Sequence, residues 1–423
     1  MKFNKICVMG LGYIGLPTAG TFAAHGIKVI GVDVNSKVVE TLRNGGLHIH
    51  EPGLRTVVEA ALKSGQLTIS TQPEEADAFI IAVPTPFYDD KRADMRAVKS
   101  ASQAILPYLR KGNLVVLEST SPPRTTVNLV APILEKSGLK AGVDFYLAYS
   151  PERVLPGQIL RELIENARVI GGVTPESARA GHDLYAIFVK GEIVETDATT
   201  AEMVKLMENT FRDVNIAIAN EFSRLADRFG INIWEAIAIA NRHPRINFLS
   251  PGLGVGGHCI SVDPWFLVEA APDLTPLIQT SRKVNDSQPR YILDLIKRAI
   301  HNLIDKKITA LGLSYKPDVD DLRESPAIEV IHLMQKEGAI VTAFEPFKPG
   351  VQLPGLSTVA SLEEAVSAAE VVILLVNHSQ FHDLKPSQLR ELTPARILID
   401  TINGWGGKEW DSAGFIMFRL GMK

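Results

Sequence analysis

The sequence predicts an α/β protein with two doubly wound Rossmann-like domains, joined by a central helical segment that contains a long spine helix. Short apolar runs, typical of buried parallel strands, alternate with helical patterns over residues 3–195 and again over residues 307–400. Between these regions, residues 199–230 contain no proline and only a terminal glycine, which predicts one helix of about 45 Å. We therefore expect three parts, namely residues 1–196, 197–304 and 305–423.

The composition excludes several classes of protein. The formal net charge of −4 gives no basic surface for nucleic acid, and no apolar run approaches the ~20 residues of a membrane helix. The two cysteines, Cys7 and Cys259, lie far apart, which favours a reducing compartment over a disulfide framework. We expect a cytoplasmic protein that binds neither nucleic acid nor a membrane, and we assign no metal ligands.

The first strand leads into a dinucleotide-binding pattern. An apolar run at residues 3–9 is followed by the pattern G-x-G-x-x-G, a helical segment and a second strand that ends at Asp33. The glycines of this pattern are Gly10, Gly12 and Gly15. They allow a tight turn and a close approach of the backbone to a pyrophosphate, while Asp33 accepts hydrogen bonds from ribose hydroxyls. Because a carboxylate repels a 2′-phosphate, Asp33 favours NAD.

Two further strands of this domain end in threonines. The strands at residues 78–83 and 114–118 are followed by Thr85 and Thr120. Both fall at the carboxyl ends of strands, where open α/β sheets bind their ligands. Each threonine therefore either caps a helix or contacts the cofactor.

The remaining strands of the domain flank a charged segment. A strand at residues 145–149 runs into a proline-bounded stretch that holds Glu152 and Arg153 in irregular structure. Arg153 is either a surface cation or a ligand for an anion. Strands at residues 168–172 and 192–195 complete the domain.

The long predicted helix carries a row of polar residues on one face. Lys205, Asn209, Arg212 and Asp213 share that face, between apolar positions. A solvated helix face is the usual explanation for such a row. A lysine and an asparagine in an apolar neighbourhood would, however, be costly to bury unless they bind something.

A second helix at residues 231–241 is followed by a basic turn and then by a glycine-rich loop. The turn contains His243 and Arg245, whose charges can face a phosphate. The loop, residues 250–257, either forms a flexible linker beside an incidental buried cysteine or brings amide groups against a ligand and a thiol, Cys259, to a site. The adjacent His258 is not expected to pair with this thiol, because neighbouring residues seldom face each other.

The third part repeats the alternation without the glycine pattern. Strands are expected at residues 307–313, 339–344, 371–376 and 397–400. Lys316 follows the first of them, where a phosphate-bearing ligand would bind. Ser325 and Pro326 are typical of a helix N-cap and first turn. A second dinucleotide site is not indicated.

With these segments assembled, the chain resembles the nucleotide-sugar 6-dehydrogenases, the UDP-glucose/UDP-mannose dehydrogenase family, over essentially its whole length. The resemblance is carried by the helix segments at residues 201–205 and 212–215 and by PERVLPG (151–157), NRHPR (241–245), GVGGHC (254–259), VDPWF (262–266) and DLRESPA (321–327). These segments are most similar to the branch that acts on UDP-N-acetylmannosamine.

The resemblance implies an NAD-dependent, four-electron oxidation of the C6 alcohol of a UDP-sugar to a carboxylate. Cys259, as thiolate, would add to the intermediate aldehyde, and loss of a second hydride would give a thioester that water hydrolyses. Lys205 and Asn209 would stabilise the developing oxyanion. Either Asp263 or Glu152 would activate the hydrolytic water.

The resemblance also assigns binding residues and an assembly. The catalytic group would comprise Cys259, Lys205, Asn209, Asp263, Glu152 and Thr120. The NAD contacts, beyond the three glycines, would be Tyr13, Ile14, Asp33, Thr85, Thr120 and Arg323. The UDP-sugar contacts would be Arg153, Val154, Lys205, Asn209, Arg212, His243, Arg245, Gly256 and Lys316. The family is dimeric through its central helices, so we expect a homodimer or a higher homo-oligomer, in which His243 and Arg245 serve the neighbouring subunit's site.

Alternatives remain at the level of substrate and chemistry. UDP-N-acetylglucosamine or another UDP-hexose would use the same chemistry. Relatives that act on UDP-glucose commonly place an arginine after the last strand, where this chain continues from Asp400 without one, which weakens a UDP-glucose assignment. A two-electron hydroxyacid dehydrogenase would need no nucleophilic thiol, and a non-catalytic NAD-binding sensor would need neither step.

Overall fold

The computed structural model describes residues 1–257, 259–407 and 409–422 and divides into two compact units. The first unit comprises Met1–Glu208 and Trp265–Pro272, and the second comprises Asn209–Pro264 and Asp273–Lys423. His258, which was not expected to pair with the thiol, lies outside the described residues. The division into three parts at residues 196 and 304 stays a prediction.

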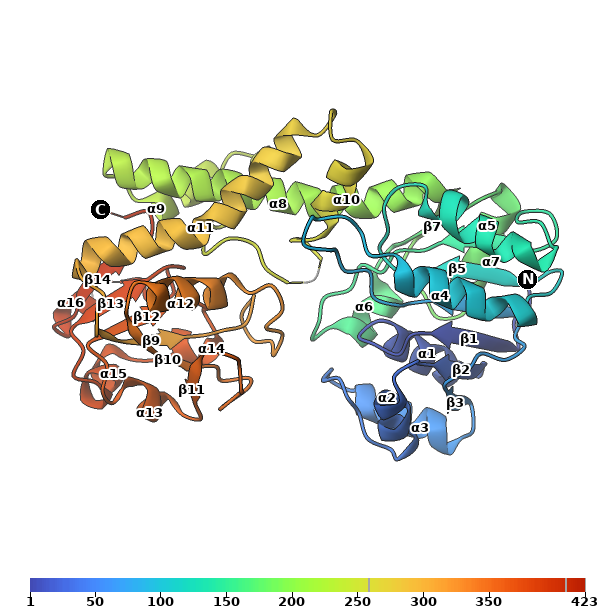
Figure 1. Cartoon of the computed structure of the whole chain (residues 1–423), viewed down its shortest axis with the longest axis horizontal. Coiled ribbons are helices and arrows are strands. Elements are labelled where there is room, and N and C mark those ends of the chain that lie inside the picture. The colour runs from blue at the N-terminus through green and yellow to red at the C-terminus, as the bar shows by residue number, and fades with distance from the viewer. Residues whose placement is uncertain (258, 408, 423) are drawn as a thin grey trace. The chain divides into compact units, whose positions relative to one another are not determined.

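The first unit is built on an eight-stranded sheet with the order β3-β2-β1-β4-β5-β6-β7-β8 (Figure 1). All neighbouring strands are parallel except β6 and β7. The strands are β1 Lys5–Met9, β2 Lys28–Val32, β3 Leu67–Ser70, β4 Ala78–Ile81, β5 Leu114–Leu117, β6 Tyr146–Tyr149, β7 Arg168–Gly172 and β8 Ile193–Asp197. The helices are α1 Gly15–Ala24, α2 Ser36–Arg43, α3 Leu54–Lys63, α4 Arg96–Ile105, α5 Ala131–Leu134, α6 Ile159–Glu165 and α7 Pro175–Tyr185.

Alternation along the strands creates a core on each face of this sheet. In β1, Ile6 and Val8 belong to one buried cluster, whereas Cys7 and Met9 belong to another. Cys7 is fully buried, and burial is the main reason that its pKa is raised to about 12. Cys7 therefore packs as a small buried hydrophobe.

The predicted long helix is present as α8, Ala198–Phe229, but its exposure pattern is unexpected. Lys205, Asn209 and Asp213 are buried, so the explanation of the polar row as a solvated face is wrong for these three residues. Apolar Phe211 and Phe229 of the same helix are instead 66% and 70% exposed. The remaining central helices are α9 Ile233–Ala240, α10 Asp263–Ala270 and α11 Pro276–Ile300.

The second unit contains a six-stranded, all-parallel sheet with the order β11-β10-β9-β12-β13-β14. Its strands are β9 Lys307–Leu311, β10 Ile340–Phe344, β11 Ser357–Val359, β12 Val371–Leu374, β13 Ile397–Asp400 and β14 Ile416–Arg419. Its helices are α12 Pro326–Lys336, α13 Leu362–Val366, α14 Ser379–His382, α15 Pro386–Leu392 and α16 Glu409–Ser412. The predicted fold class, with two doubly wound sheets and one long helix, is confirmed.

One local prediction in this unit is confirmed in its positions, although the expected side-chain contact is absent. Ser325 occupies the N-cap position of α12, and Pro326 follows at the first helical position, as expected. The serine side chain nevertheless makes no capping hydrogen bond, and its hydroxyl is buried without a hydrogen-bond partner.

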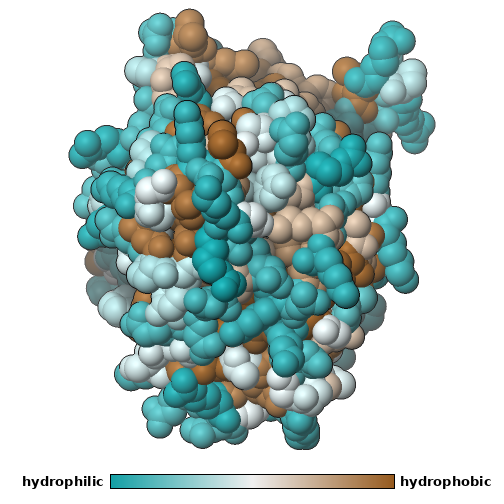
Figure 2. Space-filling model, turned by 90° about the vertical axis from the view of Figure 1, so that its right-hand side faces the viewer, coloured by the Kyte–Doolittle hydropathy of each residue, from teal (hydrophilic) through white to brown (hydrophobic). Residues whose placement is uncertain are grey.

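The surface of the first unit is mixed in character. In Figure 2, apolar side chains are scattered singly or in small groups among hydrophilic ones. None of the helices in the described ranges combines the length and the apolar character that a membrane crossing requires.

Candidate active site

The loop between β1 and α1 is shaped for a dinucleotide. Gly10 adopts a φ of +95°, and a Cβ there would lie 2.5 Å from the carbonyl oxygen of Ala82. A Cβ on Gly15 would lie 1.9 Å from the carbonyl oxygen of Gly10, so only glycine allows this closure. Gly12 is exposed, and nothing lies within 4 Å of the position of its missing Cβ. Ile14 provides no side-chain cap for α1, and Tyr13 beside it is half-buried against the core, so the helix N-terminus suits a pyrophosphate.

Asp33, at the end of β2, lies beside this loop. Its Oδ2 accepts a hydrogen bond from the Leu11 amide at 3.0 Å, and its Oδ1 accepts one from the Asn35 amide at 2.8 Å. The carboxylate is half-buried and retains lone pairs that can accept from ribose hydroxyls. The residues present therefore fit the adenosine side of NAD. Sequence reasoning missed His48, whose Nε2 lies 2.9 Å from the Leu11 carbonyl oxygen.

The two strand-end threonines join the ends of β4 and β5. The Thr85 hydroxyl donates to the carbonyl oxygen of Thr120 at 2.7 Å. Neither threonine is the N-cap of a helix in the described ranges, so the capping alternative is wrong. The nearby Ser119 hydroxyl donates to the carbonyl oxygen of Val83 at 2.7 Å, which adds a second link.

Glu152 belongs to a buried charged cluster that the sequence did not reveal. Arg168, which is 4% exposed at the start of β7, donates to Oε2 of Glu152 and, at 3.3 Å, to Oε1 of Glu118. The Tyr185 hydroxyl also donates to Glu118, at 2.8 Å. Burial raises the pKa of Glu118 to about 7, with a contribution from the charge of Glu152 and against the opposing charge of Arg168. The signal in the sequence was an arginine that opens an otherwise apolar strand.

Arg153 and Val154 extend from the same segment. The Arg153 guanidinium pairs with Glu208 of α8 at 2.8 Å and donates to the Ala167 carbonyl oxygen at 3.1 Å. Arg153 is therefore not a plain surface cation, and a bound anion would meet it beside Glu208. Val154 packs at the edge of the first core.

In the second unit, a buried polar network holds the glycine loop against α8 and α11. Asp213 accepts from Arg282 at 2.5 Å and from Asn285 at 2.8 Å. Asn285 accepts from Asn220 at 3.0 Å, and Asn220 in turn accepts from the Gly252 amide at 2.9 Å. The loop is thus a packed segment and not a linker. The pKa of Asp213 is raised, because burial outweighs the attraction of Arg282.

Glycine is required where this loop touches its neighbours. A Cβ on Gly254, whose φ is +123°, would lie 2.7 Å from the Asn285 carbonyl oxygen. A Cβ on Gly256 would lie 2.5 Å from the carbonyl oxygen of Glu324. The Gly257 amide donates to the Arg323 carbonyl oxygen at 3.1 Å. The close approach explains the glycine spacing better than flexibility does.

The thiol follows directly, beside an aromatic ring. Cys259 is half-buried, and its carbonyl oxygen accepts from the Asp263 amide at 2.8 Å, at the start of α10. The ring of Tyr315 lies against Gly257, where a Cβ would be 2.8 Å from its Cε2. Burial raises the pKa of Tyr315 to about 12, with contributions from Asp321 and Cys259 that outweigh those of Arg323 and Arg212. Sequence reasoning missed Tyr315, although it lies directly before Lys316.

Asn209 and Asp263, both assigned to the catalytic group, contact each other in the structure. The Asn209 side-chain amide donates to Oδ2 of Asp263 at 2.5 Å, and the two residues are 6% and 2% exposed. Lys205, one turn before Asn209, is 8% exposed. This buried amide–carboxylate pair can orient a polar group of a substrate.

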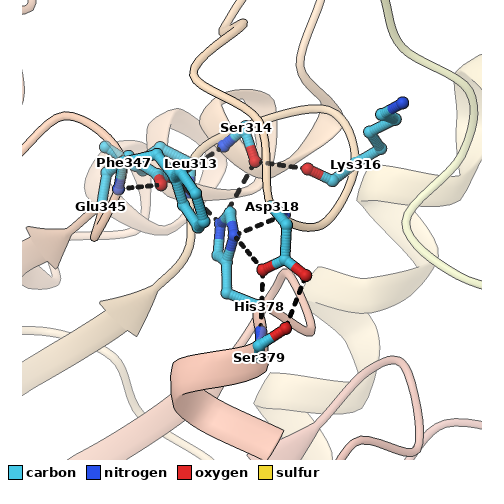
Figure 3. A network of polar contacts seen from close by, with 8 residues as sticks. All are labelled: Leu313, Ser314, Lys316, Asp318, Glu345, Phe347, His378 and Ser379. Atoms are coloured by element: carbon cyan, nitrogen blue, oxygen red, sulfur yellow. Dashed lines mark hydrogen bonds and ion pairs between the residues drawn. The ribbon is translucent and has the colours of Figure 1, made fainter. Parts of the chain in front are cut away.

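The other residues assigned to the UDP-sugar lie on the surface of the second unit. Arg212 is exposed on α8, and His243 and Arg245 are exposed in the turn after α9. Arg323, assigned to NAD, forms an ion pair with Asp321 at 2.7 Å. Lys316 is half-buried and extends away from the polar cluster beneath it (Figure 3).

Comparison with known proteins gives this arrangement a family. Residues 4–189 match the NAD binding domain, residues 199–287 the central domain and residues 309–406 the UDP binding domain of the UDP-glucose/GDP-mannose dehydrogenase family. The matches together span most of the chain.

Individual relatives resemble the chain over nearly their full lengths. An NDP-N-acetyl-D-galactosaminuronic acid dehydrogenase from Ralstonia solanacearum is 49% identical over 418 residues, which cover 96% of this chain and 98% of the relative. A UDP-N-acetyl-D-mannosamine dehydrogenase from Yersinia pestis is 49% identical over 425 residues, which cover 96% of this chain and 100% of the relative. The structure of a UDP-D-ManNAc dehydrogenase from Pyrococcus horikoshii has a TM-score of 0.92 at 39% identity and covers 99% of both chains. The chain therefore belongs to the UDP-glucose/GDP-mannose dehydrogenase family and is an NAD-dependent nucleotide-sugar dehydrogenase.

Proposed function

We propose that the enzyme oxidises the C6 alcohol of UDP-N-acetyl-D-mannosamine to the carboxylate of UDP-N-acetyl-D-mannosaminuronate through a thioester on Cys259. The observation that carries this proposal is the half-buried thiol at the end of a loop that a buried network and an aromatic ring hold in place. A positioned thiolate is the nucleophile that converts an aldehyde into an acyl group without releasing it. The relatives named UDP-N-acetyl-D-mannosamine dehydrogenase support this sugar.

The side chains divide the work between oxidation and hydrolysis. NAD, when bound in the first unit, would supply the hydride acceptor for both oxidations. The Cys259 sulfur adds to the aldehyde carbon, and Lys205 and Asn209 donate hydrogen bonds to the oxygen that becomes negatively charged. Loss of the second hydride leaves the thioester, which water hydrolyses to the acid and the free thiol. Asp263 and Glu152 are the two carboxylates proposed to activate that water, and variants of each assign the role.

Binding of the nucleotide and the sugar is assigned to the residues that the family resemblance implied. We assign the UDP-sugar to Arg153, Val154, Arg212, Gly256 and Lys316 of one subunit. His243 and Arg245 are proposed to serve the partner's site, because both are exposed in the isolated chain. The cofactor contacts of Thr85, Thr120 and Arg323 are likewise proposed from the family resemblance.

A homodimer through the central helices forms part of the proposal. Apolar side chains are exposed along α8, among them Met207 at 54% and Phe211 at 66%. Exposed apolar rows of this kind mark interaction surfaces. We expect sedimentation analysis to show a dimer, and Phe211→Glu to shift the equilibrium toward monomer. A wild-type chain that sediments as a monomer at micromolar concentration would contradict this part.

The central experiment measures NADH release with matched UDP-sugars. We expect turnover of UDP-N-acetylmannosamine, with about two NADH formed for each sugar, because two hydrides leave the same carbon. One NADH for each sugar would favour the two-electron alternative. Turnover of other UDP-hexoses, with none of the mannosamine compound, would remove the substrate assignment.

A second candidate substrate has a specific observation in its favour. Relatives named NDP-N-acetyl-D-galactosaminuronic acid dehydrogenase match the chain at the same 49% identity as the mannosamine enzyme from Yersinia pestis. The galacto and manno sugars differ only in the orientation of ring substituents, which a few hydrogen bonds distinguish. The assay must therefore include UDP-N-acetylgalactosamine beside the manno and gluco compounds.

A further inference from the structure

A fully buried histidine in the second unit takes no part in the proposed chemistry. His378 follows β12 and precedes α14, and it is 0% exposed. Its ring stacks on Phe347, with the two centroids 5.2 Å apart. Figure 3 shows the ring at the centre of a polar cluster, directly below the turn that carries Lys316. A buried imidazole must have both ring nitrogens satisfied, which makes its partners informative.

The two nitrogens of His378 have different partners. Nδ1 accepts a hydrogen bond from the backbone amide of Asp318 at 2.9 Å. This assigns the proton of the neutral ring to Nε2, which lies 3.2 Å from both Ser314 Oγ and Glu345 Oε2. The Ser314 hydroxyl donates onward to the Lys316 carbonyl oxygen at 2.7 Å. One ring therefore connects both ends of the turn at residues 314–318.

Glu345 also supports the near end of this turn, and at the far end Ser379 holds the Asp318 side chain while His378 holds its backbone amide. Oε2 of Glu345 accepts from the amides of Leu313 and Ser314 at 2.7 and 3.0 Å. At the far end, Asp318 adopts a φ of +58°, which a residue other than glycine holds only when its surroundings fix it. The Asp318 carboxylate is held by Ser379, which directly follows the histidine in the chain.

The turn carries the side chains that face the proposed site. Tyr315 lies against Gly257, two residues before the thiol, and Lys316 is a proposed contact of the UDP-sugar. Both belong to the second unit, as does every residue of the cluster. A displacement of the Asp318 end would therefore move the Tyr315 ring and the Lys316 ammonium, which belong to the same turn.

We propose that His378 is a positioning residue for the UDP-sugar, which acts by holding the turn at residues 314–318 at its Asp318 end. The inference rests on the proposed function, because it takes Lys316 and Tyr315 as parts of the substrate site. It assigns to a buried side chain of the second unit an effect on the affinity for the UDP-sugar and none on the affinity for NAD.

Three substitutions separate the two hydrogen-bonding ends of the ring. His378→Asn keeps an acceptor oxygen near the place of Nδ1, whereas His378→Gln keeps a donor near the place of Nε2. His378→Ala keeps neither. We expect the KM for the UDP-sugar to rise about tenfold in the alanine variant, less in the glutamine variant and least in the asparagine variant. The asparagine variant should rise least because it keeps an acceptor for the backbone amide of Asp318. The KM for NAD stays unchanged, and kcat at saturation falls less than about twofold.

The control variant and the outcomes that would contradict the inference use the same two KM values. His382→Ala removes an exposed histidine from the adjacent helix α14 and should leave both KM values unchanged. Equal KM values for the UDP-sugar in the asparagine and glutamine variants, or a parallel rise in the KM for NAD, would overturn the inference. If the alanine variant fails to fold, the asparagine and glutamine pair decides the question.

Failure of the proposed function is recognised separately. Wild-type enzyme that oxidises none of the UDP-sugars would refute that function before any variant is compared. Calorimetric binding of UDP-N-acetylmannosamine, without NAD, then tests the positioning role on its own. Affinity that falls in the alanine variant supports the role, and unchanged affinity refutes it.

Discussion

The first strand of each sheet leads into a glycine turn of similar backbone geometry. The turn in the first sheet suits a dinucleotide, whereas the protein's own side chains fill the corresponding place in the second sheet. In the first sheet, the Gly10 amide donates to the Val32 carbonyl oxygen at 2.7 Å, and Gly10 has a φ of +95°. In the second, the Gly312 amide donates to the Phe344 carbonyl oxygen at 2.9 Å, and Gly312 has a φ of +90°. In each sheet an acid, Asp33 or Glu345, directly follows the second strand along the chain. Its carboxylate accepts a hydrogen bond from the amide of the leucine that follows the glycine, Leu11 or Leu313.

The two turns differ in how soon a helix begins after them and in how deeply the acid is covered. Helix α1 begins at Gly15, whereas the corresponding helix α12 begins only at Pro326. Asp33 remains half-buried, but Glu345 is 1% exposed beneath His378 and Phe347. In this protein, the strand, glycine and acid suit a dinucleotide where the helix begins directly after the turn and the acid remains accessible to a ligand. Otherwise the protein's own side chains fill the place, and the longer loop is free to serve another ligand.

The largest expected effect separates the thiol chemistry from the cofactor turn. Cys259→Ala should lower formation of the acid by about a thousandfold or more, because no thioester can form. Binding of NAD, measured by calorimetry, should remain as in the wild type, because the turn after β1 is untouched. Cys7→Ala is the matched control and should keep its activity. Undiminished acid formation by the Cys259 variant would end the thioester account.

The next effect compares the two acids directly. Asp33→Ala should raise the KM for NAD roughly tenfold to hundredfold, because hydrogen bonds from the ribose to a carboxylate are lost. Glu345→Gln should leave that KM unchanged and lower the free energy of unfolding by about 1–3 kcal/mol, since buried amides lose a charged acceptor. Steady-state kinetics and urea unfolding report the two quantities. A raised KM for NAD in the Glu345 variant would break the distinction between the sheets.

A third test uses the pH dependence of stability, in which two buried acids should act with opposite signs. Burial acts to raise the pKa of Glu345, but hydrogen bonds from His378 and the amides of Leu313 and Phe347 outweigh it, and the pKa is lowered. Its stabilisation is therefore present above about pH 4.5 and is lost as the pH falls through the lowered pKa.

Glu118 in the first sheet should behave in the opposite way. Its pKa is raised to about 7, so its ionisation destabilises the fold as the pH rises from about 4.5 to 7, and the cost is complete above that. Glu118→Gln should remove this loss of stability at pH 8. Glu345→Gln should instead remove the stabilisation that the ionised Glu345 provides above about pH 4.5. Unfolding midpoints at about pH 3 and pH 5 for the Glu345 variant, and at about pH 5 and pH 8 for the Glu118 variant, measure the contrast against the wild type. Slopes of the same sign would contradict it.

The smallest expected effect concerns the longer loop of the second sheet. Tyr315→Phe keeps the ring on Gly257 and removes only the hydroxyl, which stays protonated because its pKa is about 12. We expect the KM for the UDP-sugar to rise about threefold, as for one lost neutral hydrogen bond, with the KM for NAD unchanged. A Tyr315→Ala variant, which also loses the ring, should show the larger change.

The regular elements could be predicted because their signals are local. The strand before Gly10, the acid at residue 33 and the long helix α8 can each be inferred from spacing within a short window. Strands β3, β11 and β14 were missed because all three lie at sheet edges and are partly exposed, so they lack the continuous apolar runs of fully buried strands. Ser325 shows that a good capping residue in the right position need not cap when its hydroxyl is buried.

The candidate site could be predicted only in part, because polar partners meet across long stretches of sequence. Cys259 and Asp263 were found from one motif, and Asn209, which contacts Asp263, from the polar row on the long helix. Arg168, Asn285 and His378 were not found, because periodicity describes which face is apolar but not which polar side chains will meet in the interior. Each becomes meaningful only through a partner at least 16 residues away.

The burial of Cys7 has a practical consequence. The chain contains two sulfhydryl groups, and the one in β1 is shielded from reagents and has a pKa of about 12, so at neutral pH an alkylating agent should modify the other alone. Incorporation of label then counts competent active centres in any preparation. Because, of the two sulfhydryl groups, only that of Cys259 is accessible, we expect peroxide to inactivate the enzyme by oxidising that one sulfur atom.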